Sequence, residues 1–211
     1  MLFLNAIVFA LFWAIAPVLC LPNPTRPHRG SFDVQATANL TWEGSLTEDG
    51  PNVTFTGRSI AEISSHIKVV APTFAWPEPI IVQLRSSSSS ARPLVKNSEH
   101  RMLCDQVTAD YGNYNDLLDQ TAELQAMPGF CRVAPTPKDQ PLSCNRLTCT
   151  GSSAVYLCNH SDNHDSISTC ARVGQYAQEI LDWCYDGKDS NVKGQLYDGD
   201  YWSVMVHADK C

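Results

Sequence analysis

The sequence predicts an α+β fold: a small disulfide-stapled sandwich in which an antiparallel sheet packs against one or two helices. Three features predict this class. They are eight closely spaced cysteines, an amphipathic helical pattern at residues 171–185, and two strand-like segments, 192–197 and 201–207, joined by a short turn. All three lie in the C-terminal half of the chain, so the expected domain spans residues 101–211.

The helix predicted at residues 171–185 carries apolar residues at steps of three and four positions, with polar residues opposite them. Thr169 is expected to be its N-cap. A second helix is predicted at residues 114–127, where a partial apolar stripe is stopped by Pro128 and Gly129.

A short strand with two buried faces is predicted at residues 153–159. Segments 192–197 and 201–207 are interpreted as a hairpin around Asp198-Gly199-Asp200. We expect the hairpin to close onto the helix at residues 171–185. We expect Cys211 to tie its end to the core, because a terminal strand frays unless something holds it.

Residues 1–20 have the shape of a signal peptide, an apolar run followed abruptly by a proline-rich segment. Cleavage after Cys20 removes one of nine cysteines and leaves an even number. In an oxidising compartment an even set is typical of a disulfide framework, although eight cysteines allow about 105 pairings. The expected disulfide residues are Cys104, Cys131, Cys144, Cys149, Cys158, Cys170, Cys184 and Cys211.

Three glycosylation sequons, at Asn39, Asn52 and Asn159, favour the same secreted, extracellular location. Residues 21–100 form a proline- and serine-rich region that ends in a polar linker. This region is interpreted as a propeptide, a loosely ordered arm, or strands that complete the downstream sheet. Residues 52–56 and 80–84 look like strands, whereas residues 60–70 fit a helix or a strand.

The charge pattern limits the expected partners. The chain has a formal net charge of −7 and scattered basic residues, which argues against a nucleic-acid partner. Nothing after the signal peptide is apolar and long enough to span a bilayer. We expect a monomer without a cofactor.

Two polar groupings contain residue types that carry chemistry. His160, Asp162, His164 and Asp165 are metal-ligand types, but their spacing in a loop gives them no reason to converge, so no metal site is predicted. Asp198, Asp200 and His207 could perform acid-base catalysis across the hairpin. Turn chemistry is the better explanation of the two aspartates, and no catalytic residue is assigned.

Exposed aromatic residues are the remaining indication of a binding surface. Trp183 lies off the apolar stripe of its helix, and Tyr197, Tyr201 and Trp202 gather near the turn of the hairpin. Aromatic residues of this kind either complete a small core or bind a partner.

The segments CNRLTC at 144–149 and SAVYLCN at 153–159, with 175–184 and 192–196, resemble small cysteine-rich secreted proteins of filamentous fungi. Many proteins of that group are regarded as candidate effectors, and a more distant similarity is to killer-toxin-like and necrosis-inducing secreted proteins. The resemblance covers residues 144–211 and transfers no catalytic residue.

The resemblance and the secretion signals together predict a non-enzymatic effector or toxin-like protein. Its expected partner is a protein or cell-wall component of a host or competitor. Two alternatives stay open. One is a small secreted ribonuclease or glycan-cleaving enzyme that uses His160, His164 or His207 with an aspartate. The other is a structural cell-wall protein.

Overall fold

A computed structural model describes residues 39–79, 101–104, 107–140, 142–185 and 187–211, all of which belong to one compact unit. The predicted signal peptide, the serine-rich linker and the strand predicted at residues 80–84 lie outside the described residues. In the described part, no helix has the length and apolar character needed to cross a bilayer.

The α+β prediction is confirmed: three helices and several antiparallel sheets are stapled by four disulfides. The helices are α1 (Ile60–Val70), α2 (Tyr114–Ala126) and α3 (Cys170–Cys184). The strands are β1 (Leu40–Ser45), β2 (Asn52–Gly57), β3 (Arg101–Leu103), β4 (Gly112–Asn113), β5 (Phe130–Val133), β6 (Ser143–Thr150), β7 (Ser153–Asn159), β8 (Ser166–Thr169), β9 (Asn191–Val192), β10 (Gly194–Tyr197) and β11 (Trp202–Ala208).

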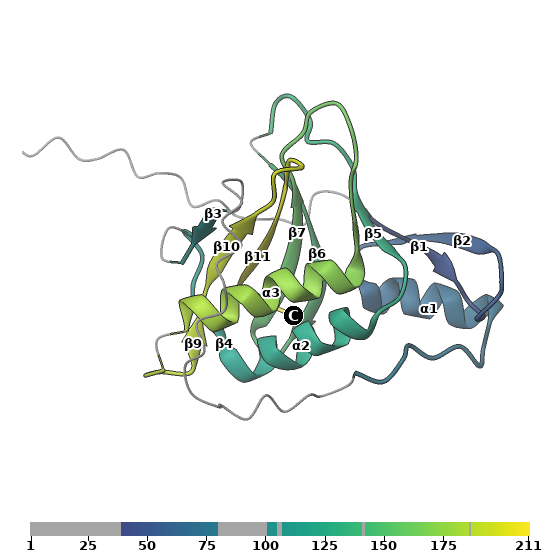
Figure 1. The fold of residues 1–211 in the computed structure, drawn as a ribbon, viewed down its shortest axis with the longest axis horizontal. Helices are drawn as coiled ribbons and strands as arrows, with labels where there is room; N and C mark the ends of the chain where they lie inside the picture. Colours follow the sequence, from purple (N-terminus) through teal and green to yellow (C-terminus); the bar gives the residue numbers. More distant parts are fainter. Residues whose placement is uncertain (1–38, 80–100, 105–106, 141, 186) are drawn as a thin grey trace, which may run out of the picture. The chain divides into compact units, whose positions relative to one another are not determined.

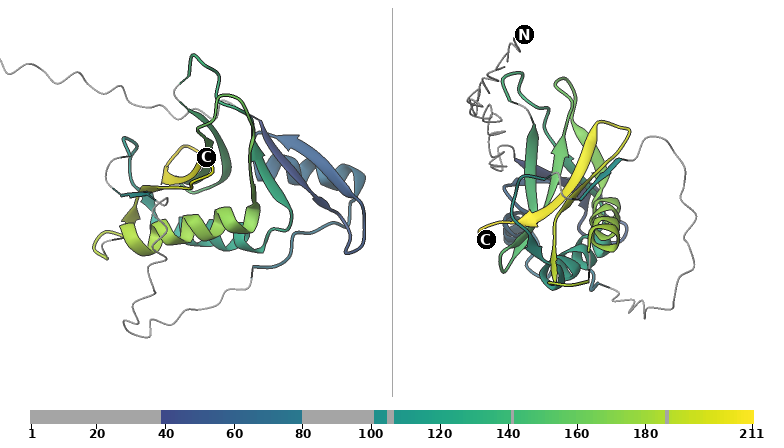
Figure 2. Two further views of the ribbon diagram at one scale, coloured as in Figure 1. Left: turned by 45° about the horizontal axis from the view of Figure 1, so that its top comes forward. Right: turned by 90° about the vertical axis from the view of Figure 1, so that its left-hand side faces the viewer.

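The central layer is a five-stranded sheet of order β3-β10-β11-β7-β6. Figure 1 and Figure 2 show α2 and α3 side by side on one face of this sheet. Their close approach depends on Gly174, because a Cβ there would lie 2.6 Å from the backbone nitrogen of Gln125 on α2. The predicted N-cap is confirmed, since the Thr169 hydroxyl accepts a hydrogen bond from the backbone nitrogen of Arg172 at 3.1 Å.

The predicted hairpin is β10 and β11, but its second strand begins one residue later than expected. Tyr201 has φ of 62° and belongs to the turn. From Trp202 onward, β11 pairs along its whole length with β7, so that Trp202 lies opposite Asn159 and His207 lies opposite Ala154. The register therefore puts His207 at the end of β11 away from the turn.

A second, four-stranded sheet has the order β2-β1-β5-β8 and is covered by α1. The segment 60–70, which the sequence left open, is helical. Because β1 pairs with β5 through four residues, described residues upstream of the linker pair with the cysteine-rich region. This arrangement matches one of the three alternatives for that region, strands that complete the downstream sheet.

The eight cysteines from Cys104 to Cys211 are all paired, as predicted, and the structure supplies the connectivity that the sequence left open. The pairs are Cys104–Cys184, Cys131–Cys170, Cys144–Cys158 and Cys149–Cys211. One pair joins β5 to the start of α3. Another ties the last residue of the chain to β6. Four disulfides are consistent with an oxidising, extracellular location.

Candidate functional site

The aromatic surface predicted near the hairpin is not assembled as one patch. Trp183 and Tyr201 are exposed, at 67% and 64%. However, Trp183 lies near the C-terminal end of α3, whereas Tyr201 lies in the turn between β10 and β11. Figure 1 shows that end of the helix and that turn at different places on the molecule. Tyr197 is half-buried and its ring lies 5.0 Å from that of His160.

Trp202 corrects the prediction, because it is only 2% exposed. Trp202, Val204 and Val206 occupy every second position of β11 and therefore share one face of the strand. All three belong to the core under the helices. The Trp202 ring packs 4.8 Å from that of Tyr176, and the Arg172 guanidinium lies over it at 5.5 Å. Trp202 therefore packs the core and is not available to a partner.

The predicted acid-base grouping at the hairpin is not formed. Asp198 is buried and accepts hydrogen bonds from Arg172, at 2.7 Å, and from the Tyr176 hydroxyl. These contacts fasten the turn to α3. Asp200 follows in the same turn, where its backbone nitrogen donates to Asp198 at 2.9 Å. His207 lies at the opposite end of β11, so no two of these groups form an acid-base pair.

The residues of metal-ligand type in the loop after β7 have separate partners. His160 contacts Ser203 on β11, His164 contacts Ser161, and Asp165 pairs with Arg132 at 3.3 Å. Within the described ranges, no three His, Cys, Asp or Glu side chains gather as a metal site would require.

His160 ends a directed chain of hydrogen bonds on the sheet face away from the helices. Tyr197 donates to Gln195 at 3.1 Å, and Gln195 donates to the buried Ser203 hydroxyl at 2.9 Å. The Ser203 proton is then free for the His160 Nε2, 2.8 Å away. A nitrogen that accepts this proton belongs to a neutral imidazole.

His207 is the second buried histidine. Its ring stacks on Tyr156 at 4.7 Å, and its Nδ1 donates to the Ala208 carbonyl. Its buried Nε2 has no hydrogen-bond partner among the described residues. Protonation would leave that N–H buried and unpaired, which is costly.

We expect the protein to lose stability in mild acid. Burial lowers the pKa of both His160 and His207 below the ordinary value of 6.5. The folded protein therefore binds fewer protons than the unfolded chain below pH 6.5, and the free energy of unfolding falls as the pH drops through the folded-state pKa values. The fall is at most about 1.4 kcal/mol per pH unit for each histidine.

Denaturant unfolding at several pH values between about 7.5 and 5 measures this loss. This pH range lies above the pH at which the Asp209 carboxyl titrates, so Asp209 does not contribute to the measured change. Burial opposes ionisation of that carboxyl, but hydrogen bonds from Tyr156 and Arg146 still hold its pKa below 3.8. The variant His160→Gln, His207→Gln should flatten the dependence. An unchanged slope in that variant would contradict the assignment.

Asn159 is not available for a glycan, which corrects the prediction at the third sequon. It is 0% exposed. Its Nδ2 donates to the carbonyls of Val133, Ala134 and His164 at 3.2, 3.0 and 2.9 Å, and its Oδ1 accepts from the Ser161 nitrogen at 2.8 Å. An N-linked glycan would attach to this same nitrogen, so the folded network excludes it.

A pocket of about 710 Å³ lies between α1, residues 74–79, α2, β6 and Cys211. Its size is in the range of small-molecule sites. The apolar wall comes from Ile60, Phe74, Trp76, Met127 and Leu147. The polar residues are Ser59, Ser64, Lys68, Glu78, Glu123, Arg146, Thr148 and Thr150.

Aromatic packing fixes the shape of this wall. The Trp76 ring meets Trp42 edge-on at 5.2 Å and Phe74 edge-on at 4.8 Å. The Trp76 indole nitrogen donates to the Ser64 hydroxyl on α1 at 2.7 Å. The segment after α1 is thus held by a core tryptophan on one side and by the helix on the other.

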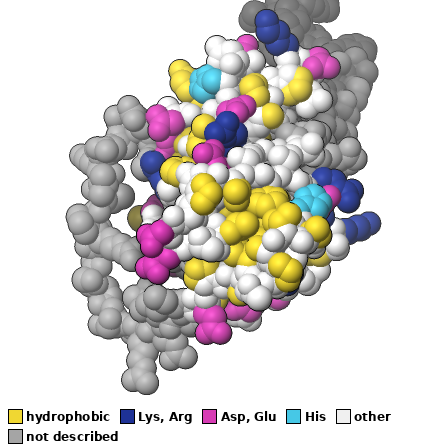
Figure 3. Space-filling view, turned by 90° about the vertical axis from the view of Figure 1, so that its right-hand side faces the viewer, with side chains coloured by type: hydrophobic (Ala, Val, Ile, Leu, Met, Phe, Trp, Pro, Cys, Tyr) yellow, Lys and Arg dark blue, Asp and Glu magenta, His cyan; other side chains and the backbone are white. Residues whose placement is uncertain are grey.

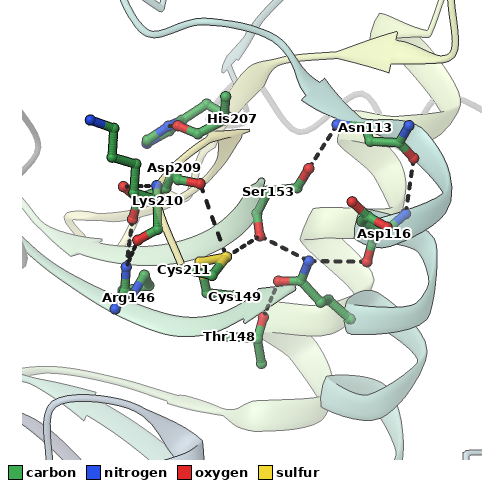
Figure 4. Close-up of a disulfide and its surroundings, with 12 residues drawn as sticks. Asn113, Asp116, Arg146, Thr148, Cys149, Ser153, His207, Asp209, Lys210 and Cys211 are labelled. Carbon is green, nitrogen blue, oxygen red and sulfur yellow. Dashed lines mark hydrogen bonds and ion pairs between the residues drawn. A yellow bond between two sulfur atoms is a disulfide. The ribbon is translucent and has the colours of Figure 1, made fainter. Parts of the chain in front are cut away.

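Figure 4 shows the opposite wall, where the Cys149–Cys211 disulfide joins the last residue of the chain to β6. Arg146 donates to Asp209 at 2.8 Å and to the Lys210 carbonyl at 3.0 Å, so its charge is already neutralised. Glu123 has no ion-pair partner among the described residues. Burial, with the nearby charge of Asp119, raises the pKa of its carboxyl.

Sequence reasoning missed the pocket because it is built from segments that are far apart in the chain. The available signal was the pair Phe74 and Trp76 in a proline-rich stretch. Comparison of the chain with protein-family models, with curated proteins and with solved structures finds no match.

Proposed function

We propose that this chain is a secreted, non-enzymatic binding protein, of the effector or toxin-like kind known from filamentous fungi, that takes its ligand in the 710 Å³ pocket. The expected ligand belongs to a protein or cell-wall component of a host or competitor. The pocket is the observation that carries the proposal, because it combines an aromatic wall with a few polar groups on a stapled scaffold.

The surroundings of the pocket favour binding over turnover. A disulfide and an ion pair hold the β6 wall, and core aromatics hold the other wall, so the cavity is formed before a ligand arrives. Asp198 and His207, the acid-base candidates of the hairpin, make structural contacts outside the pocket lining.

A pair of tryptophan substitutions on α1 tests the proposal. Ala61 lines the pocket, whereas Ser65 is exposed on the same helix and does not. Ala61→Trp should fill the pocket and weaken binding at least about tenfold, and Ser65→Trp should bind like the wild type. The assay measures binding of the purified secreted protein to separated cell-wall polysaccharides and extracellular proteins of host and competitor.

Equal loss in both variants would indicate damage to α1 and would be visible as a lower melting temperature. Equal retention would show that binding occurs elsewhere on the molecule. A wild-type protein that binds none of the fractions would contradict the proposed function itself.

A further inference from the structure

The asparagines of the three sequons differ in their exposure to solvent. Asn159 is excluded by its buried hydrogen bonds. Asn39 and Asn52 are exposed, one directly before β1 and the other as the first residue of β2. Only these two amide nitrogens can carry a glycan in the folded protein.

The two accessible sequons lie at opposite ends of one strand pair. Leu40 is opposite Gly57 and Ser45 is opposite Asn52 in the antiparallel register of β1 and β2. Asn39 therefore flanks the end of β2, and Asn52 flanks its start. Glycans at both positions would bracket β2 along its whole length.

β2 is the edge strand that lies beside both accessible sequons. It is an edge of the four-stranded sheet and pairs only with β1 among the described strands. On its other side, the Nδ1 of His66 contacts the Thr56 carbonyl at 3.1 Å, which occupies one group of that edge. An edge strand with free backbone groups is a template for pairing with a second chain.

Apolar side chains next to this edge add to the hazard. Val69 and Val70, at the end of α1, are 80% and 65% exposed, and Val53 and Phe55 of β2 are only partly buried. Figure 3, which views the molecule from the side of α1 and β2, shows hydrophobic side chains gathered in the middle of that face. A patch of this kind favours association in water.

We infer that N-linked glycans on Asn39 and Asn52 shield the free edge of β2 and prevent it from pairing with a second copy of the chain. The inference rests on the secretory route of the proposed function, but not on the pocket or its ligand. It also gives a physical reason for the monomer that the sequence predicts.

Two substitutions at one position separate the glycan from the strand edge. Thr54 is exposed on β2 and completes the Asn52 sequon, so Thr54→Ala and Thr54→Lys both remove that glycan. Lysine on an edge strand opposes pairing, whereas alanine leaves the edge open. Both variants are made with Asn39→Gln and secreted from a glycosylating host, and light scattering after size-exclusion chromatography gives their molar mass.

We expect glycopeptide mapping of the wild type to find glycans at Asn39 and Asn52 and none at Asn159. The alanine variant should show an about twofold or larger rise in molar mass, and the lysine variant should stay monomeric. A monomeric alanine variant, a wild type without glycan at Asn52, or a glycan at Asn159 in folded protein would overturn the inference. None of these outcomes depends on ligand binding, so they do not test the proposal that the pocket binds a ligand.

Discussion

Replacement of Asn159 by leucine should lower the free energy of unfolding by about 4 kcal/mol, although the two side chains are similar in size. The substitution leaves the buried Val133 carbonyl and the partly buried Ala134 and His164 carbonyls without the Nδ2 donor. It also leaves the buried Ser161 nitrogen without its acceptor. Each unsatisfied buried group costs about 1–3 kcal/mol. Denaturant unfolding under non-reducing conditions measures the loss.

Asn145 offers a matched control within the same sheet. It is also 0% exposed, but neither its Oδ1 nor its Nδ2 has a hydrogen-bond partner among the described residues. Asn145→Leu removes an unsatisfied amide from the core and should leave the stability equal or higher. If both leucine variants lost the same free energy, cavity shape and not hydrogen bonding would account for the effect.

Asn159 also shows where sequence reasoning reached its limit. The sequon Asn159-His160-Ser161 is a local pattern, and it predicts a modification from three residues alone. Whether the amide is free depends on Val133 and Ala134, which lie 25 or more positions earlier in the chain. Burial of this kind is decided by tertiary packing.

Elements with a strong local period were predictable. The helices at 114–126 and 170–184 and the hairpin follow from apolar spacing and turn residues, and the Thr169 cap follows from residue type. For Trp202 the sequence left core packing and partner binding both open, and the structure shows core packing. Trp202, Val204 and Val206 stand at every second position and form one buried face of β11. This period predicts burial of Trp202 more strongly than its place beside the turn predicts exposure.

Short strands and disulfide partners were not predictable in the same way. β1 has only six residues, and β5 has four, so neither gives a period long enough to distinguish strand from loop. Their pairing joins segments some 90 positions apart. The even cysteine number predicted complete pairing, but the partners follow from the same long-range packing.

Loss of the Cys149–Cys211 disulfide should be the most damaging change at the pocket. The bond closes a loop with a sequence separation of 62, and restriction of such a loop in the unfolded chain is worth about 4 kcal/mol. The variant Cys149→Ala, Cys211→Ala should unfold at correspondingly lower denaturant concentration. Its last residues should also become accessible to carboxypeptidase, because a terminal segment frays when its tether is removed.

Lys210→Ala is the control, since Lys210 is exposed and its substitution leaves both the disulfide and Asp209 in place. It should change the stability by less than about 0.5 kcal/mol. If the chain end of the Cys149→Ala, Cys211→Ala variant resisted carboxypeptidase, the contacts of Asp209 with Tyr156 and Arg146 would be enough to hold the end without the disulfide. If the end is released, Arg146 loses its neutralising partner at the pocket wall, and the disulfide then maintains the charge balance of the pocket as well as the fold.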